Sequence, residues 1–181
     1  MLRKFFPTAR LRSSSELSGA VTPNLAATLT PDPEVLEPLR NLAGRYALAA
    51  VSSSATGRLR ACFEATGLDA LLSEAVTFSA EDSLAVPTSK PNPAVYLHAG
   101  RALGIEPEQG LAIEDSVAGV TSAVAAGYVT VGNLMFVPAD ERECRRAELI
   151  DAGAVAVTET WRALADVLLL SAAPAGGSRA R

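Results

Sequence analysis

Short apolar runs alternate with amphipathic stretches through the middle of this chain, and this alternation constrains the fold more than any other feature. The clearest run, residues 46–51 (YALAAV), is followed at once by three serines. A short apolar run bounded by polar residues is typical of a strand buried on both faces of a parallel sheet. Later runs predict further strands at residues 75–78, 111–113, 128–131 and 154–157.

The stretches between these runs have the pattern of helices. The first begins after Asp32, a preferred N-cap residue, carries apolar side chains at helical spacing and ends at Gly44. Further helices are predicted at residues 55–66, 91–104, 116–126, 139–151 and 160–170. Strands that alternate with helices imply right-handed crossovers and a parallel sheet with helices on both faces. The predicted fold class is therefore α/β.

The two ends of the chain differ in composition from this middle part. Residues 1–30 are basic at the start and serine-rich, and we expect a poorly ordered tail or a remnant of a further domain. The core domain is predicted at residues 31–170, and residues 171–181 are expected to form a flexible tail. The Arg- and Ser-rich start also has the composition of a mitochondrial targeting segment, which is the alternative to the cytoplasmic location that we expect.

Composition and charge exclude several function classes. The chain of 181 residues has a net charge of −4, whereas a nucleic-acid binder needs clustered Lys and Arg. No apolar run approaches the ~20 residues that a membrane span requires. Cys62 and Cys144 lack the spacing of a zinc site or a disulfide framework. We therefore expect no nucleic-acid or membrane partner, and a monomer or weak dimer.

The carboxyl ends of the predicted strands carry the candidate functional residues, as is usual in open α/β sheets. Ser52 and Ser53 follow the first strand and precede a helix. A hydroxyl and several backbone N–H groups at such a turn can cradle a phosphate. The alternative is that serine serves here only as a helix N-cap.

A second candidate is Lys90, in the segment Thr88-Ser89-Lys90-Pro91-Asn92-Pro93. Pro91 restricts the backbone of Lys90 to extended geometry and is expected to start a helix, which would hold the ammonium group beside the strand ends. There it can balance the charge of a phosphate, and Asn92 is a candidate contact to the substrate. The alternative is a solvated loop lysine.

The third candidate is the pair Glu114 and Asp115, directly after a buried strand. Two adjacent carboxylates at such a place are costly unless a cation or hydrogen bonds compensate them. Carboxylate oxygens are suitable ligands for Mg²⁺, which takes one or two of them and keeps several waters. The alternative is that Asp115 caps the next helix and Glu114 is exposed.

These features in this order, a strand ending in serine, then Lys-Pro-x-Pro, then a strand ending in Glu-Asp-Ser-x-x-Gly, resemble the haloacid dehalogenase-like (HAD) hydrolase superfamily. The pattern is similar to the branch that contains β-phosphoglucomutase and small sugar-phosphate phosphatases, and it covers residues 31–169. The resemblance implies a Rossmann-like core, Mg²⁺ as cofactor, and phosphoryl transfer on a small phosphorylated metabolite, which we expect to be a sugar phosphate.

The resemblance also implies roles for individual residues. Ser52 would bind the transferred phosphoryl group, and Lys90 would stabilise charge on that group and on the nucleophile. Asp115 would ligate Mg²⁺, and Glu114 would ligate it directly or through water. Ser116 would be a further polar contact near the metal.

The chain departs from this family at its first strand, which carries an Asp nucleophile and, two residues later, an Asp that acts as general acid and base. The acids before Ser52 are Glu16, Asp32, Glu34 and Glu37, and Pro33 places Asp32 at a helix start. We therefore expect the Asp-x-Asp strand and the helical cap after it to be missing, with the core incomplete. The sheet would then close over the gap, or residues before 31 or a second chain would fill it.

Three functions are compatible with this reading of the sequence. The first is an Mg²⁺-dependent phosphatase or phosphomutase that is active only when the missing strand is supplied. The second is a non-catalytic remnant that binds Mg²⁺ and phosphate weakly. The third is a receiver-type signalling domain. Such a domain would need an acidic cluster on an early strand and an acceptor Asp at the end of a middle strand, whereas the strand at residues 46–51 ends in serines.

Overall fold

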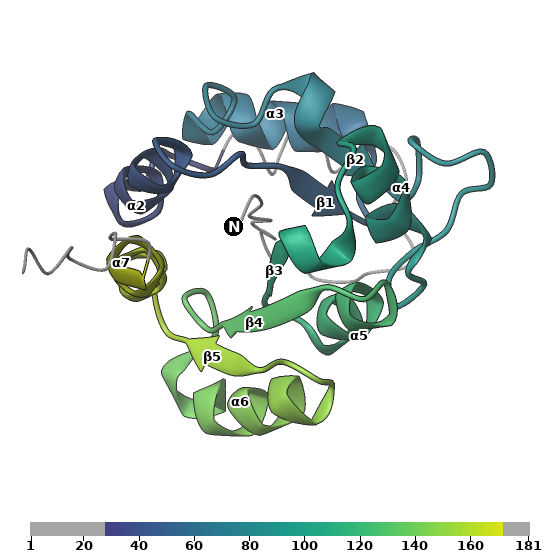
Figure 1. The fold of residues 1–181 in the computed structure, drawn as a ribbon. Helices are drawn as coiled ribbons and strands as arrows, with labels where there is room; N and C mark the ends of the chain where they lie inside the picture. The colour runs from purple at the N-terminus through teal and green to yellow at the C-terminus, as the bar shows by residue number, and fades with distance from the viewer. Residues whose placement is uncertain (1–27, 172–181) are drawn as a thin grey trace, which may run out of the picture.

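The strands lie in two parallel sheets in a computed structural model that describes residues 28–171 (Figure 1). The first sheet pairs β1 (Ala50–Ser52) with β2 (Thr77–Ser79). The second has the order β3 (Leu111–Glu114), β4 (Val129–Asn133) and β5 (Ala156–Thr158). All pairs are parallel, so the carboxyl ends of the strands within each sheet lie at one edge. The predicted α/β class is confirmed.

Helices follow the strands in alternation, as the sequence pattern predicts. They are α2 (Pro33–Ala43), α3 (Thr56–Thr66), α4 (Ala94–Ala102), α5 (Val117–Ala125), α6 (Arg142–Asp151) and α7 (Trp161–Ser171). Within residues 28–171, none of them has the length and hydropathy needed to cross a bilayer. Of the tails predicted at residues 1–30 and 171–181, residues 1–27 and 172–181 lie outside the described residues.

Several element boundaries differ from the sequence prediction, and contacts in the structure explain two of these differences. The strand predicted at residues 46–51 is reduced to β1, because β2 offers pairing partners only to Ala50–Ser52. The helix predicted to start at Pro91 begins instead at Ala94, where the Asn92 side chain accepts a hydrogen bond from the Ala94 backbone N–H at 2.9 Å. The helix start predicted at Asp32 is confirmed, since its carboxylate accepts from the Glu34 N–H at 2.9 Å.

The two sheets are not joined by backbone hydrogen bonds within the described part of the chain. Figure 1 shows β1 and β3 facing each other from the two sheets, with α2 and α7 at one end. The sequence analysis considered three arrangements for the missing strand, and the first was a sheet that closes over the gap. Residues 28–171 do not form such a closed sheet.

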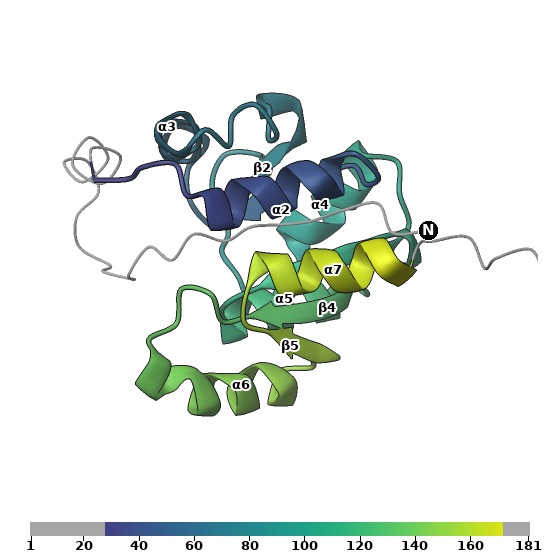
Figure 2. The same ribbon diagram turned by 90° about the vertical axis from the view of Figure 1, so that its left-hand side faces the viewer.

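Side chains join what the backbone does not. One core cluster combines Ala50 of β1 and Ile113 of β3 with Leu42 of α2 and Leu164 of α7. Figure 2 shows α2 and α7, which contribute to this cluster, lying side by side. A second cluster combines Val51, Ala112, Val95 and Ala123, which come from β1, β3, α4 and α5. Both clusters take residues from both sheets, so side-chain packing joins the two sheets.

Truncation of Leu42 tests this account of the core. Leu42 is fully buried where α2 packs against α7, so Leu42→Ala should lower the free energy of unfolding by roughly 2–5 kcal/mol. Leu170→Ala is the matched control, because Leu170 is 76% exposed and its truncation should change stability by about 0.5 kcal/mol or less. Urea unfolding measures both, and equal effects would contradict the packing described.

Candidate functional site

Lys90 and Glu114 form a buried ion pair at the carboxyl ends of the strands. Their side chains are 6% and 0% exposed, and the Lys90 ammonium donates to Oε1 of Glu114. The same ammonium donates to the backbone carbonyl of Val51 at 3.0 Å. Because Val51 belongs to β1 and Glu114 ends β3, Lys90 links the two sheets. The alternative of a solvated loop lysine is wrong.

Tyr96 completes this cluster. It lies on α4, is fully buried, and donates its hydroxyl hydrogen to the same Oε1 of Glu114. The Lys90 ammonium lies 5.3 Å from the centre of the Tyr96 ring, which adds a cation–π contact. The alternative of an exposed Glu114 is therefore wrong too, because this carboxylate is fully buried and accepts from both Lys90 and Tyr96.

Burial and neighbouring charge act on this cluster in opposite directions. Burial raises the pKa of Glu114, and the charge and hydrogen bond of Lys90 offset part of that rise. Burial, followed by the charge of Glu114, raises the pKa of Tyr96 well above its ordinary value. Tyr96 therefore stays protonated and remains a hydrogen-bond donor at neutral pH.

Gly119 gives the Glu114 carboxylate the space that it occupies. A Cβ atom added at Gly119 would lie 2.0 Å from Oε2 of Glu114 and 2.9 Å from Oγ of Ser116. Ser116 is the N-cap of α5, and its Oγ accepts a hydrogen bond from the Gly119 N–H at 3.1 Å. The Glu-Asp-Ser-x-x-Gly motif thus starts α5 and seats the carboxylate against its first turn.

The serine turn after β1 is joined to the Lys90 segment by its hydroxyl groups. Ser52 Oγ accepts from the Ser54 N–H at 3.1 Å, and Ser53 Oγ accepts from the Lys90 backbone N–H at 3.0 Å. These bonds place Ser52, Ser53 and Lys90 together, as the sequence predicts. Lys90 is therefore held at both its backbone and its ammonium.

The first turn of α3 has a partner that the sequence analysis missed. The Thr56 N–H donates to the carboxylate of Asp82, and Arg58 pairs with Glu81 at 3.1 Å. The turn after β2 presents these acids, because Ser79 Oγ accepts from the N–H groups of Glu81 and Asp82. Among the described residues, an acid thus lies at the α3 N-terminus, where the sequence suggested a phosphate cradle.

The remaining predicted residues lie at helix starts. Asp115 is half-buried between Glu114 and Ser116, at the end of β3. Asn92 is exposed just before α4, where its side chain accepts from the Ala94 N–H, and its backbone carbonyl accepts a hydrogen bond from the buried Ser122 hydroxyl at 2.8 Å. Residues 28–171 contain no cluster of three or more His, Cys, Asp or Glu side chains placed to hold a metal. The roles of Asp115 and Asn92 toward metal or substrate stay predictions.

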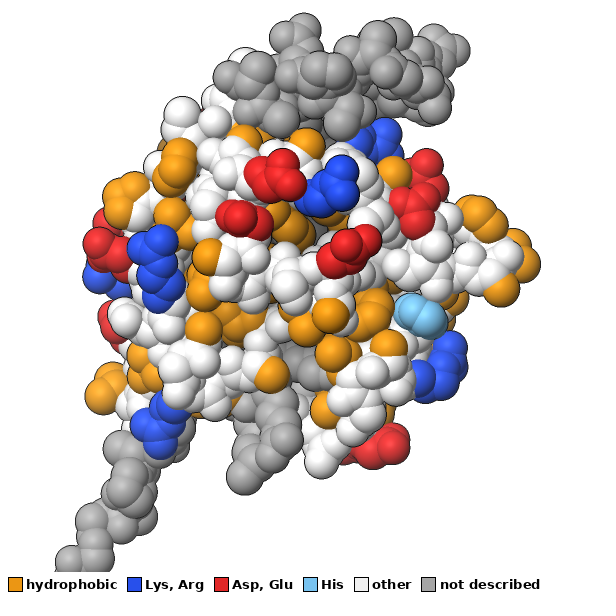
Figure 3. Space-filling view, turned by 90° about the horizontal axis from the view of Figure 1, so that it is seen from above, with side chains coloured by type: hydrophobic (Ala, Val, Ile, Leu, Met, Phe, Trp, Pro, Cys, Tyr) orange, Lys and Arg blue, Asp and Glu red, His pale blue; other side chains and the backbone are white. Residues whose placement is uncertain are grey.

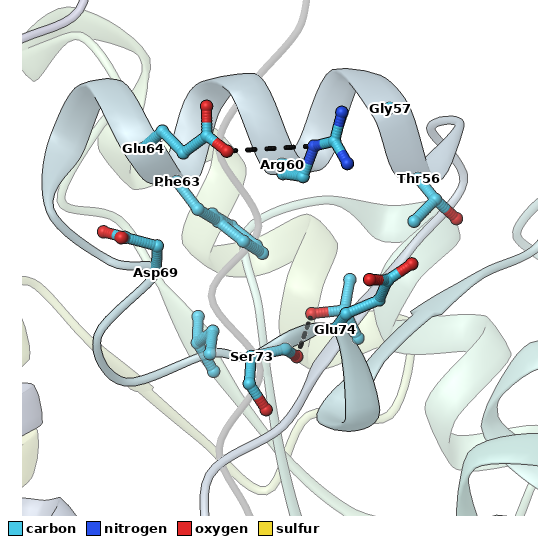
Figure 4. A pocket seen from close by; sticks show the side chains of 10 residues that line it. Thr56, Gly57, Arg60, Phe63, Glu64, Asp69, Ser73 and Glu74 are labelled. Carbon is cyan, nitrogen blue, oxygen red and sulfur yellow. Dashed lines mark hydrogen bonds and ion pairs between the residues drawn. The ribbon is translucent and has the colours of Figure 1, made fainter.

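A cavity of about 400 Å³ lies elsewhere, between α3 and the segment that leads into β2 (Figure 4). Arg60 and Glu64 form an ion pair at 3.8 Å on its α3 side, and Asp69 and Glu74 also line it. The lining includes none of Ser52, Lys90 or Glu114. The cavity is therefore separate from the Lys90 cluster.

The surface above α3 and α4 mixes acidic and basic side chains among apolar ones (Figure 3). The chain's single histidine is visible on this face. His98 is half-buried, and its ring packs edge-on against Phe78 with the ring centres 5.8 Å apart. His98 is therefore a packing residue of α4.

Comparison with known proteins gives the family of this chain. The family model described as haloacid dehalogenase-like hydrolase matches residues 15–127, which include Ser52, Lys90, Glu114 and Asp115. The chain belongs to the haloacid dehalogenase-like hydrolases. The third possibility, a receiver-type domain, is therefore wrong.

Solved structures of HAD hydrolases have the same fold. A HAD family hydrolase from Deinococcus radiodurans R1, determined with bound phosphate and sodium, is 31% identical with a TM-score of 0.70, over 82% of this chain and 63% of that one. A beta-phosphoglucomutase candidate from Thermotoga maritima is 25% identical with a TM-score of 0.66, over 81% of this chain and 63% of that one. The resemblance to the β-phosphoglucomutase branch is confirmed.

A curated relative matches a shorter region. The CBBY-like protein of Arabidopsis thaliana is 39% identical over 56 residues, which are 31% of this chain and 18% of that protein. The matched region thus spans less than two thirds of the length of each of these relatives.

Replacement of Gly119 tests the close contact between the α5 backbone and the Glu114 carboxylate. Gly119→Ala should lower the free energy of unfolding by about 1–3 kcal/mol, because its Cβ would overlap the Glu114 carboxylate. Gly57→Ala is the matched control in the first turn of α3, where an added Cβ meets nothing within 4 Å. Gly57→Ala should stabilise by up to about 1 kcal/mol. A neutral Gly119→Ala in urea unfolding would refute the close contact.

A double-mutant cycle tests the buried pair. Lys90→Met and Glu114→Gln should each destabilise the chain by roughly 3–5 kcal/mol, because each leaves one buried partner uncompensated. The double variant should lose clearly less than the sum of the two. Additive losses in urea unfolding would mean that the two groups do not interact.

Proposed function

We propose that this chain is the core of an Mg²⁺-dependent phosphatase or phosphomutase that acts on a small phosphorylated metabolite, with a sugar phosphate as the substrate class. One observation carries the proposal: an ammonium group is held at the carboxyl ends of β1 and β3 by Glu114 and by the Val51 carbonyl. A fixed cation at this edge of an α/β sheet stabilises the charge of a bound phosphoryl group. The phosphate bound to the HAD hydrolase of Deinococcus radiodurans supports this ligand class.

The roles proposed for the other residues follow from their places around Lys90. Ser52 and Ser53 would bind the oxygens of the phosphoryl group, since their turn is hydrogen-bonded to the Lys90 segment. Ser116 and Asn92 would contact the metal shell or the substrate from the starts of α5 and α4.

Mg²⁺ fits the carboxylates at the end of β3. Asp115 is half-buried there and would ligate it, and Glu114 would reach it through a water, because Oε1 already accepts hydrogen bonds from Lys90 and Tyr96. One or two carboxylates with several waters form an ordinary Mg²⁺ shell. The ion would supply positive charge to the oxygens of the phosphoryl group.

The nucleophile is proposed to come from a further strand. Asp32 is the N-cap of α2, so it is engaged at a helix start and does not end a strand. An Asp-x-Asp strand between β1 and β3 would pair with both and would place its acids beside Lys90. Its first Asp would attack phosphorus and form an aspartyl-phosphate, its second would give the leaving oxygen a proton, and water would release phosphate.

The divided sheet favours one second candidate, a non-catalytic remnant that keeps weak binding of Mg²⁺ and phosphate. Among the described residues, the contacts that hold Lys90 do not depend on a further strand, so binding can persist without turnover. The cytoplasmic location and the monomeric or weakly dimeric state expected from the sequence remain predictions.

Hydrolysis of p-nitrophenyl phosphate and of sugar phosphates, with Mg²⁺ and with EDTA, tests the proposed function. The 181-residue chain should be compared with the same chain carrying an added Asp-x-Asp strand at its N-terminus. We expect Mg²⁺-dependent turnover from the extended chain and a higher midpoint of thermal unfolding. A folded extended chain that neither hydrolyses nor binds any phosphate monoester would overturn the proposal, and binding without turnover would favour the remnant.

Lys90→Ala in the active form should lower kcat/KM by about 100-fold or more, because the fixed cation at the phosphoryl group is lost. His98→Ala is the matched control on the same side of the fold and should keep activity near normal, because His98 packs on Phe78 away from these contacts. A retained rate in Lys90→Ala would remove Lys90 from the site.

A further inference from the structure

Tyr96 shares one oxygen of Glu114 with Lys90. The phenol and the ammonium both donate to Oε1, and neither residue is more than slightly exposed. The two donors also touch each other, since the ammonium lies over the Tyr96 ring. Tyr96, Glu114 and Lys90 therefore form a closed triangle of contacts.

The three corners of this triangle differ in rigidity. The lysine side chain has four rotatable bonds, whereas the tyrosine ring is enclosed in the core beside Val95 and Ala99. The ring of Tyr128 packs against it with the centres 5.7 Å apart. Tyr96 is therefore the rigid partner, and its hydroxyl fixes where Oε1 lies.

The other end of the carboxylate is confined as well. Oε2 of Glu114 lies over Gly119, at a place that any Cβ would fill. A carboxylate held at Oε1 by a rigid phenol and limited at Oε2 by the α5 backbone has one orientation. The ammonium of Lys90 takes its direction from that orientation and from the Val51 carbonyl.

We propose that Tyr96 is a positioning residue: its hydroxyl orients the Glu114 carboxylate, and through it fixes the Lys90 ammonium at the carboxyl ends of β1 and β3. The purpose of this fixed ammonium rests on the proposed phosphoryl-transfer function, whereas the positioning itself is a property of the folded chain. If Tyr96 served only to fill space, Tyr96→Phe would leave the Lys90 ammonium unaffected, since phenylalanine keeps the ring that supplies the packing.

The lysine content of the chain allows a direct test. Lys4 and Lys90 are its two lysines, so ¹⁵N-lysine labelling gives two side-chain ammonium signals in NMR, and Lys4→Arg assigns them. We expect slow exchange of the Lys90 ammonium hydrogens with water in the unchanged chain. In Tyr96→Phe the exchange should accelerate about tenfold or more, because the hydrogen bond that orients Glu114 is lost.

Tyr128→Phe is the matched control. It removes another buried tyrosine hydroxyl from the adjacent ring, and among the described contacts that hydroxyl does not reach Glu114. Lys90 exchange in Tyr128→Phe should stay within about twofold of the unchanged chain. Unchanged exchange in Tyr96→Phe, or equal acceleration in both variants, would overturn the positioning role.

A second measurement follows the phenol itself. With ¹³C-labelled tyrosine, the hydroxyl signal that disappears in Tyr96→Phe belongs to Tyr96 and should exchange slowly, and exchange as fast as that of a solvent-exposed phenol would also overturn the proposal. Both experiments use the chain without metal or substrate. Lack of phosphatase activity would therefore contradict the proposed function and leave the positioning role of Tyr96 intact. Phosphatase activity together with unchanged Lys90 exchange in Tyr96→Phe would refute the positioning role and leave the proposed function intact.

Discussion

The buried contact between Lys90 and Glu114 is the interaction on which the arrangement of the strand ends depends. Two charges taken out of water are costly unless each is fully hydrogen-bonded. Here the ammonium also reaches the Val51 carbonyl, and the carboxylate also receives the Tyr96 hydroxyl. The same bonds connect β1 with β3, between which the described chain forms no backbone hydrogen bond. The same hydrogen bonds thus compensate the buried charges and join the two sheets.

Helix starts supply most of the geometry around this pair. Ser116 caps α5 and brings Gly119 under the carboxylate, while the Asn92 side chain accepts from the first backbone N–H of α4, the helix that carries Tyr96. The residues that the family resemblance assigns to metal and substrate therefore also decide where two helices begin. This double use explains why a motif of a few residues can fix a site whose parts come from distant segments.

The sequence was sufficient for the order of strands and helices, because each apolar run and each glycine stop is a local signal. It failed where a distant partner decides: β1 is short because β2 offers only three pairing residues, and α3 receives the carboxylate of Asp82 from another loop. Tyr96 was missed because its position in α4 has the spacing of an ordinary core residue. The Lys90 and Glu114 candidates were found because strand ends meet at one edge of a sheet.

The divided sheet has a consequence for how the native chain opens. The units that contain β1–β2 and β3–β5 share side-chain packing, and each keeps its own strand hydrogen bonds. Separation of the two would expose the apolar clusters and the buried pair but, within residues 28–171, would break no hydrogen bond between paired strands. Local unfolding can divide at such a boundary, and the amide hydrogens of β1 and β3 would then exchange in different cooperative units although they face the same site.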